Sequence, residues 1–76
     1  MIALSSNINW DEVIYKKARG IDDYDLGEVQ EVNDNVVITQ KGKDKFYLVK
    51  RLVDRFDGLY LWFSITETEA HEFRND

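Results

Sequence analysis

The segment from Asp25 to Gln40 constrains the fold of this chain most, because it combines two apolar runs with a strong turn between them. Leu26–Val32 is rich in residues that favour strands, and Val36–Gln40 has the same character. Between the two runs stands Asn33-Asp34-Asn35, whose side chains tolerate positive φ and bond back to their own backbone. The segment therefore predicts a β-hairpin and, with it, a mainly β protein.

The first of these strands breaks the alternation of a regular strand. Val29 and Val32 are three residues apart, so a regular strand would point them to opposite faces. Either a bulge near Gln30 and Glu31 intervenes, or the strand is long and curved enough to serve the core from both sides, as in small barrels.

Three glycines indicate chain reversals. Gly27 stands at a strand entrance, where glycine marks a bulge, a tight bend or a close approach of another backbone. Gly20 and Gly27 bracket a reversal through the acidic run Asp22–Asp25, and Gly58 completes an Asp-Gly turn. We therefore expect structural roles for Gly20, Gly27 and Gly58.

Residues 9–20 contain two conflicting signals. Asn9 as N-cap with Glu12 three residues later is typical of a helix start, which favours a helix over residues 10–19. Val13-Ile14-Tyr15, in contrast, is β-branched and aromatic, which favours a short strand leading into the turn. The local residues favour the helix, and the strand remains the alternative.

Beyond the hairpin, short apolar segments alternate with polar ones. Lys41–Lys45 predicts a polar, flexible loop, and Phe46–Val49 a short strand. From Leu48 to Phe56 the apolar residues follow a 3.6-residue spacing, which predicts one or two helical turns that cross over.

Leu59–Ile65 is expected to be the last strand. Its alternation places Leu59, Leu61, Phe63 and Ile65 on one face and Tyr60, Trp62 and Ser64 on the other. Thr66 with Glu69 then forms a capping box, which predicts a short helix to about Phe73.

Residues 13–65 resemble the PRC-barrel family of small β-barrel domains. The resemblance rests on LGEVQEV at Leu26–Val32 after Gly20, the turn that follows, and the apolar pattern of Phe46–Val49 and Phe56-Asp57-Gly58. It implies a small closed or partly open β-barrel of five or six strands, with a short crossover helix and a short C-terminal helix. It also implies that Val13–Lys17 is the first strand, so for this segment the resemblance favours a strand over a helix.

The family also suggests a class of function. Its members serve in assembly, including archaeal division machinery and ribosome maturation, so the resemblance implies an adaptor that docks on other proteins. One difference from the family lies in the predicted strand Phe46–Val49, where members often have Ile-Pro and this chain has Leu48-Val49.

Length and composition indicate one domain over residues 1–76, with residues 1–9 a loosely held arm and 74–76 a frayed tail. The hydrophobic core of a 76-residue chain is only marginally sufficient to stabilise a fold, and no cysteine is present to form a disulfide. Self-association is one way to gain the missing stability. The absence of cysteine fits a reducing, cytoplasmic setting. The apolar run at the start is too short for a signal or membrane segment, so no membrane insertion is expected.

Charge is distributed unevenly along a chain whose net charge is −5. Residues 22–34 hold six acidic residues and no basic one, while residues 41–55 hold six basic residues against two acidic. Such segregation either reflects ordinary solvated faces or creates a dipolar surface for a charged partner or a second copy.

Residues suited to catalysis are few. His71 is the only histidine and stands beside Glu72 on the expected C-terminal helix, which favours a solvated side chain. Aligning the acidic run Asp22–Asp25 with a calcium loop would put Tyr24 and Leu26 at ligand positions, which argues against calcium. We therefore predict a protein that is not an enzyme and binds no cofactor or metal.

The candidate site residues form two groups. If the last strand fills the core from one face, Tyr60 and Trp62 point outward, and with Tyr47 they form a predicted homodimer or partner interface; the alternative is that the helix at 67–73 covers Trp62. The second group is a basic patch for a docking partner or, in the competing hypothesis, for RNA or a ribosome through residues 41–55. Its members are Lys43, Lys45, Lys50, Arg51 and Arg55.

Overall fold

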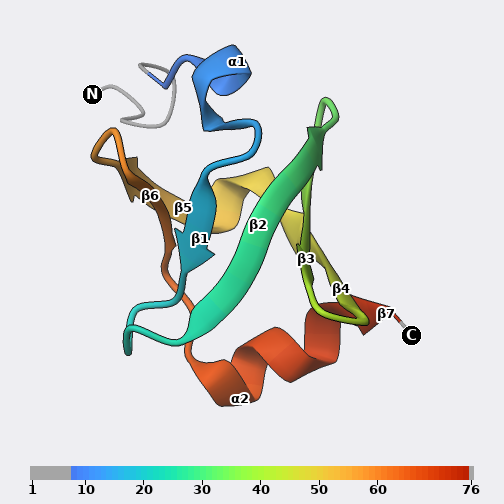
Figure 1. Cartoon of the computed structure of the whole chain (residues 1–76). Helices are drawn as coiled ribbons and strands as arrows, with labels where there is room; N and C mark the ends of the chain where they lie inside the picture. Colours follow the sequence, from blue (N-terminus) through green and yellow to red (C-terminus); the bar gives the residue numbers. More distant parts are fainter. Residues whose placement is uncertain (1–7, 76) are drawn as a thin grey trace.

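A single sheet of seven strands forms most of the computed structural model, which describes residues 8–75 (Figure 1). The strands are β1 (Lys17–Arg19), β2 (Asp25–Val32), β3 (Val36–Lys41), β4 (Asp44–Val49), β5 (Val53–Phe56), β6 (Tyr60–Phe63) and β7 (Arg74–Asn75). They follow the order β5-β6-β1-β2-β3-β4-β7, and every pair is antiparallel except β1 with β6.

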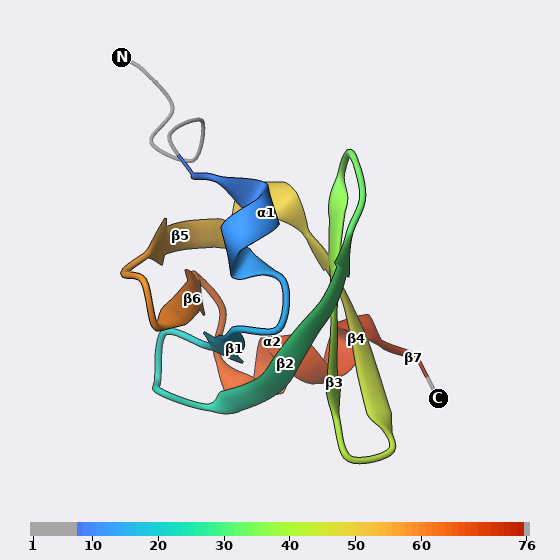
Figure 2. The ribbon, with the colours of Figure 1, turned by 45° about the horizontal axis from the view of Figure 1, so that its top comes forward.

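The sheet is strongly curved. The long strand β2 lies between a group made of β1, β6 and β5 and a second group made of β3 and β4 (Figure 2). Within residues 8–75 the strand order begins with β5 and ends with β7, so backbone hydrogen bonds do not close the sheet. The mainly β prediction is thus confirmed, and the curved sheet stays open in its hydrogen bonding.

Two short α-helices and two 3-10 turns complete the secondary structure of the described residues. They are α1 (Trp10–Val13), η2 (Lys50–Leu52), α2 (Glu67–Ala70) and η3 (His71–Phe73). The capping box is confirmed, because the Thr66 hydroxyl accepts from the Glu69 amide while the Glu69 carboxylate accepts from the Thr66 amide. The helix predicted to reach Phe73 does so, with a 3-10 turn at its end.

The hairpin predicted over residues 26–40 is confirmed as β2 and β3. The Asn33 amide donates to the Val36 carbonyl at 2.8 Å, which closes the turn. The register shifts between Val29 and Glu31, where the extra residue makes a bulge. The bulge explains the broken alternation, since Val29 is fully buried whereas Gln30 and Glu31 are both exposed.

Both expectations for residues 10–19 need correction. Asn9 caps the helix as predicted, because its side chain accepts from the Asp11 amide, but the helix ends at Val13. The strand implied for Val13–Lys17 is also wrong, since β1 begins only at Lys17 and Tyr15 has φ of 70°. Tertiary pairing is the cause: the Tyr15 amide donates to the Val29 carbonyl, which ends the helix and aligns β1 with β2.

Two further expectations in the second half are wrong, and a third, the crossover, is confirmed only in part. The loop expected at Lys41–Lys45 is a tight turn at Gly42-Lys43, because β3 and β4 continue to either side of it. The crossover helix is limited to η2, because Val53 pairs with Phe63 in the sheet instead of continuing the helical spacing. Leu59 precedes the strand that begins at Tyr60 and is 70% exposed, so it does not belong to the inward face.

The C-terminal tail pairs instead of fraying. Arg74 and Asn75 form β7 opposite Phe46 and Lys45, because the capped helix returns the chain to the edge of β4. The predicted arm lies mostly outside the described residues, as does Asp76.

The core fills the concave side of the sheet and is apolar apart from one side chain. Its largest members are Phe46, Phe63, Leu26, Leu48 and Leu61. Thr39 is the exception: it is fully buried on β3, and its hydroxyl has no hydrogen-bond partner among residues 8–75.

We expect Thr39→Val to stabilise the protein. A buried hydroxyl without a partner loses its hydration on folding, at a cost of about 1–3 kcal/mol, and valine has nearly the same shape. The unfolding free energy should rise by about 1–2 kcal/mol, and each kcal/mol raises the melting temperature by roughly 4–8 °C in a domain of this size. Thermal unfolding followed by circular dichroism tests this, with exposed Thr68→Val as the control; an equal or lower melting temperature for Thr39→Val would contradict it.

Candidate protein-interaction surface

The convex face of β5, β6 and β1 carries two aromatic rings between two arginines. Leu61 and Phe63 are fully buried, so strand alternation turns Tyr60 and Trp62 to the opposite face, where both are half-buried. The ladders place Arg55 and Arg19 on either side of Trp62, as its partners on β5 and β1. We call Arg55, Trp62, Tyr60 and Arg19 the Trp62 surface.

Cation–π and edge contacts order these side chains. The Arg55 guanidinium carbon lies 4.9 Å from the centre of the Trp62 ring system, and that of Arg19 lies 4.9 Å from the Tyr60 ring centre. The two rings meet edge to face with centroids 5.8 Å apart. The four side chains therefore form one continuous stripe.

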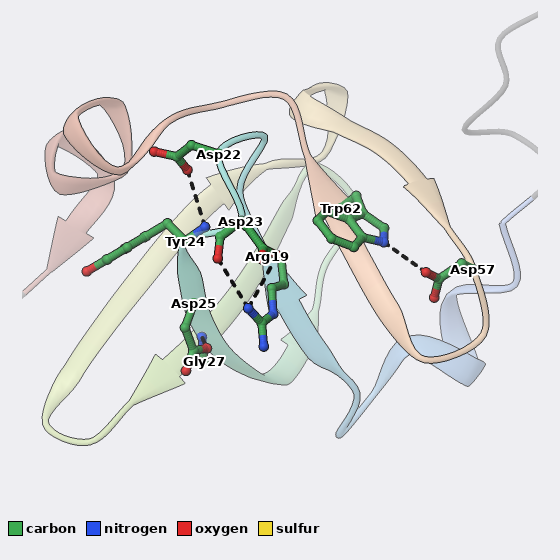
Figure 3. Close-up of polar contacts among 8 residues, drawn as sticks. All are labelled: Arg19, Asp22, Asp23, Tyr24, Asp25, Gly27, Asp57 and Trp62. Carbon is green, nitrogen blue, oxygen red and sulfur yellow. Dashed lines mark hydrogen bonds and ion pairs between the residues drawn. The ribbon is translucent and has the colours of Figure 1, made fainter.

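Each arginine of the stripe also has a carboxylate. Arg55 pairs with Asp54 at 2.9 Å. Arg19 pairs with Asp23 at 3.3 Å (Figure 3). Each end of the stripe thus combines a cation with an anion, one pair on either side of the two rings.

The β5–β6 turn fixes the orientation of Trp62. Its indole N–H donates to Asp57 Oδ2 at 3.0 Å, as Figure 3 shows. The other oxygen of Asp57 accepts from the amides of Leu59 and Tyr60 at 2.9 and 2.7 Å. Gly58 completes the turn with φ of 95°, a conformation that favours glycine.

These hydrogen bonds make Asp57 unusually acidic. The indole of Trp62, followed by the amides of Tyr60 and Leu59, lowers the pKa of Asp57 from 3.8 to about 2. Because the folded-state pKa is depressed, ionised Asp57 contributes stability that is present above pH 3.8 and is lost as the pH falls towards 2. The side chain is exposed, so solvent screening keeps the contribution small.

We expect the Trp62 indole proton to report this titration. In a pH series of NMR spectra, its chemical shift should move with a midpoint near 2, because its acceptor is Asp57. Trp10 provides the internal control, since its ring lies under the Lys50 ammonium, 4.5 Å away. A midpoint near 3.8 for Trp62 would show that the hydrogen bond does not hold in solution.

The contacts of Trp62 leave little support for a covering helix. Within residues 8–75 its ring, cation and hydrogen-bond contacts come from Arg55, Asp57 and Tyr60. The helix at 67–73 instead buries Ala70 and approaches Tyr24, whose ring lies 6.2 Å from that of His71. Beside Trp62 is a small hollow of about 180 Å³, whose rim includes Ile21, 67% exposed.

Tyr47 does not extend this surface. It points outward from β4, 37% exposed, while its neighbours Phe46 and Leu48 are buried. However, β1, β2 and β3 separate β4 from β6 in the sheet. The structure therefore brings Tyr60 and Trp62 together and leaves Tyr47 elsewhere on the sheet.

The five predicted basic residues are also dispersed. Lys43 and Lys45 lie at one end of β4, while Lys50 and Arg51 lie in η2 at the other end, about 17 Å away at the usual rise of a strand. Lys50 is placed over the Trp10 ring, and Arg55 belongs to the Trp62 surface. Consequently the basic stretch of the sequence is not one patch in space.

Two contributors to the surface were not found from the sequence. The role of Asp57 had a local signal, because in an Asp-Gly turn followed by a strand the aspartate carboxylate can accept hydrogen bonds from the next backbone amides. Arg19 had none, since its place beside Trp62 depends on the parallel pairing of β1 with β6.

The described residues show no sign of a metal centre or a membrane span. Residues 8–75 contain no group of three or more metal-ligating side chains, and no helix among them is long and apolar enough to cross a membrane.

Comparison of the sequence with known protein families finds no matching family model, and comparisons with curated proteins and with solved structures find no match either.

Proposed function

We propose that this protein is a non-catalytic interaction module that binds a second copy of itself through the Trp62 surface. The observation that carries the proposal is the pair of half-buried rings, Trp62 and Tyr60, held between two guanidinium groups on an exposed sheet face. Tryptophan, tyrosine and arginine are the residues that most often dominate the binding energy of protein interfaces.

The charges of the stripe favour a second copy over a strongly charged partner. A two-fold contact presents the same patch on both sides, so the patch must complement itself. If two stripes meet in opposite directions, the Arg55 end of one copy faces the end of the other that carries Arg19 and Asp23. Each arginine then meets a carboxylate, and the four rings lie at the centre.

The fold and setting belong to the same proposal. We infer that the curved sheet is a partly open barrel of the PRC-barrel type. The LGEVQEV segment at Leu26–Val32, with Gly27 as its second residue, supports this inference because it resembles the family's sequence pattern. An adaptor of this kind works in the cytoplasm and serves the assembly of a larger machine. The absence of cysteine fits such a compartment.

RNA binding has less support than protein binding. Phosphate contacts need clustered cations that nearby carboxylates do not oppose, and the five basic residues are divided among three places. A salt-sensitive mobility shift of RNA that is lost in a Lys50→Glu/Arg51→Glu variant would favour this alternative.

Light scattering tests the self-association. We expect the mass at tens of micromolar to rise with concentration towards twice the 9.0 kDa of one chain. A mass that stays at 9.0 kDa over the whole range would contradict a homodimer.

A further inference from the structure

Two oppositely charged side chains lie at corresponding positions on the two sides of β6. Arg19 lies on β1 at the level of Trp62, because the parallel ladder pairs the two residues. Asp57 follows β5 on the other side of β6, at the level of Tyr60, since its amide donates to the Tyr60 carbonyl at 3.2 Å. Figure 3 shows Arg19 and Asp57 on opposite sides of Trp62.

A two-fold axis through the centre of the Tyr60–Trp62 pair exchanges these two positions. The axis is perpendicular to the sheet face and passes between the two rings, whose centroids are 5.8 Å apart. It reverses the direction of β6 and exchanges the β1 side with the β5 side. The level of Trp62 on the β1 side of one copy therefore meets the level of Tyr60 on the β5 side of the other. Arg19 of each copy then faces Asp57 of the second copy.

We propose that Arg19 of each copy pairs with Asp57 of the other, and that these two equivalent ion pairs set the alignment of the homodimer. The inference rests on the proposed homodimer and adds the charges that orient it. Complementary charges across an interface fix its alignment and exclude wrong ones.

Both side chains keep hydrogen-bonding capacity for a second copy. Asp57 is exposed, and its two oxygens accept from three donors of its own chain, whereas a carboxylate offers about four acceptor sites. Arg19 contacts Asp23 through Nη1, and a guanidinium carries five N–H donors. Asp57 is ionised at neutral pH, because its hydrogen bonds lower its pKa to about 2.

The other charges of this face are compatible with the same axis. Arg55 of one copy comes to Lys17 of the other, because the ladders place these two residues at exchanged levels. Glu28, the ladder partner of Lys17 on β2, offers Arg55 a carboxylate. Asp54, 2.9 Å from Arg55, offers one to Lys17. The two neighbouring cations are therefore balanced and do not oppose the alignment.

The same axis also matches an exposed apolar side chain with a hollow. Leu59, one position before Tyr60 and 70% exposed, is carried to the level of Phe63 of the other copy. The hollow of about 180 Å³ beside Trp62 lies at that level, and it is smaller than the roughly 300–1,000 Å³ of ligand pockets. Its lining residues are Ile21, Asp54, Arg55, Trp62, Phe63 and Ser64. One apolar side chain is a suitable occupant, so charge and shape lead independently to the same axis.

Exchange of the two charges tests the inference. Arg19→Glu and Asp57→Lys each place like charges opposite one another at both pairs, so each variant alone should self-associate at least about tenfold more weakly. In an equimolar mixture, one pair is the native one and the other has its charges exchanged. The mass of the mixture should therefore rise towards twice the 9.0 kDa of one chain, at a concentration where each variant alone stays near 9.0 kDa.

Arg51→Glu is the matched control for the change of charge. Arg51 is exposed in η2, outside the strands of this face, so the variant should self-associate like the unmodified protein. Circular dichroism establishes that each variant is folded.

Isotope-filtered NMR provides a test without any substitution. In an equal mixture of labelled and unlabelled protein, only contacts between copies give filtered nuclear Overhauser effects. We expect such effects from the methyl groups of Leu59 to the indole ring of Trp62. This test decides the matter even if Asp57→Lys unfolds, because Asp57 also caps the β5–β6 turn.

The outcomes separate this inference from the proposed homodimer. An unmodified protein that stays at 9.0 kDa would contradict the homodimer and the alignment together. An unmodified protein that doubles in mass leaves the homodimer in place. In that case the alignment is wrong if folded charge variants fail to restore the dimer on mixing, or if the effects between Leu59 and Trp62 are absent.

Discussion

Gly27→Ala is expected to cause the largest loss of stability among substitutions of a single small residue. At φ of 92° a side chain is strained, and a Cβ at this position would lie 2.2 Å from the Gln40 carbonyl oxygen. The obstacle is backbone of β3, which pairs with β2 through Glu28 and Gln40, so relief requires breaking that register. Strain and overlap together should cost roughly 4 kcal/mol or more.

Such a loss approaches the whole stability of a domain of this size. At about 0.05–0.15 kcal/mol per residue, a chain of 76 residues is stable by only about 4–11 kcal/mol. Urea unfolding measures the change, and we expect Gly27→Ala to be partly or fully unfolded before denaturant is added.

Two other glycines serve as matched controls. Gly58 also has positive φ, but a Cβ there would meet no atom of residues 8–75 within 4 Å, so Gly58→Ala should cost only the strain of about 1 kcal/mol. Gly20 has no positive φ, but a Cβ there would lie 2.6 Å from the Ile65 carbonyl oxygen, so Gly20→Ala isolates the steric part. Equal losses for Gly27→Ala and Gly58→Ala would show that the close approach to Gln40 relaxes without cost.

Trp62→Glu is expected to abolish self-association while the protein stays folded. The substitution removes the largest ring of the proposed interface and places charges opposite each other across the two-fold contact. Loss of a dominant interface residue costs at least about 2 kcal/mol, which weakens the dimer about 30-fold or more. The fold should persist, because the Trp62 side chain is only half-buried and the new carboxylate lies near Arg55.

Tyr47→Glu is the control for an exposed aromatic residue elsewhere. The strands β2 and β3 separate the strand of Tyr47 from the nearest strand of the Trp62 surface, so this change should leave the dimer intact. Light scattering and circular dichroism on both variants decide the matter. An unfolded Trp62→Glu protein would assign Trp62 to the core, and a folded dimer would move the interface away from β6.

Features encoded within a few residues were predictable from the sequence. The turn at residues 33–35, the capping box at Thr66, the Asn9 cap and the inward face of Leu61 and Phe63 depend on local backbone preference or on alternation. The sequence also indicated the outward direction of Tyr60 and Trp62. Half of the candidate surface therefore followed from one strand.

Features that depend on pairing between distant segments were not predictable. Val53 and Phe56 share a helical spacing with Leu52, but their hydrogen bonds with β6 make them a strand. The segment after Val13 turns at Tyr15 because Val29 binds its amide, and Arg74 joins β4 after a helix returns the chain.

The same division runs through the candidate site. The sequence by itself determined the hairpin, the caps, the turn glycines and the direction of each side chain on β6, because these follow from short-range sterics and hydrogen bonds. Only the tertiary structure decided that Arg19 and Arg55 enclose Trp62, that Tyr47 lies apart, and that the basic residues disperse. The physical reason is that strand order and register are set by burial of the whole core, to which residues far apart in the chain contribute together.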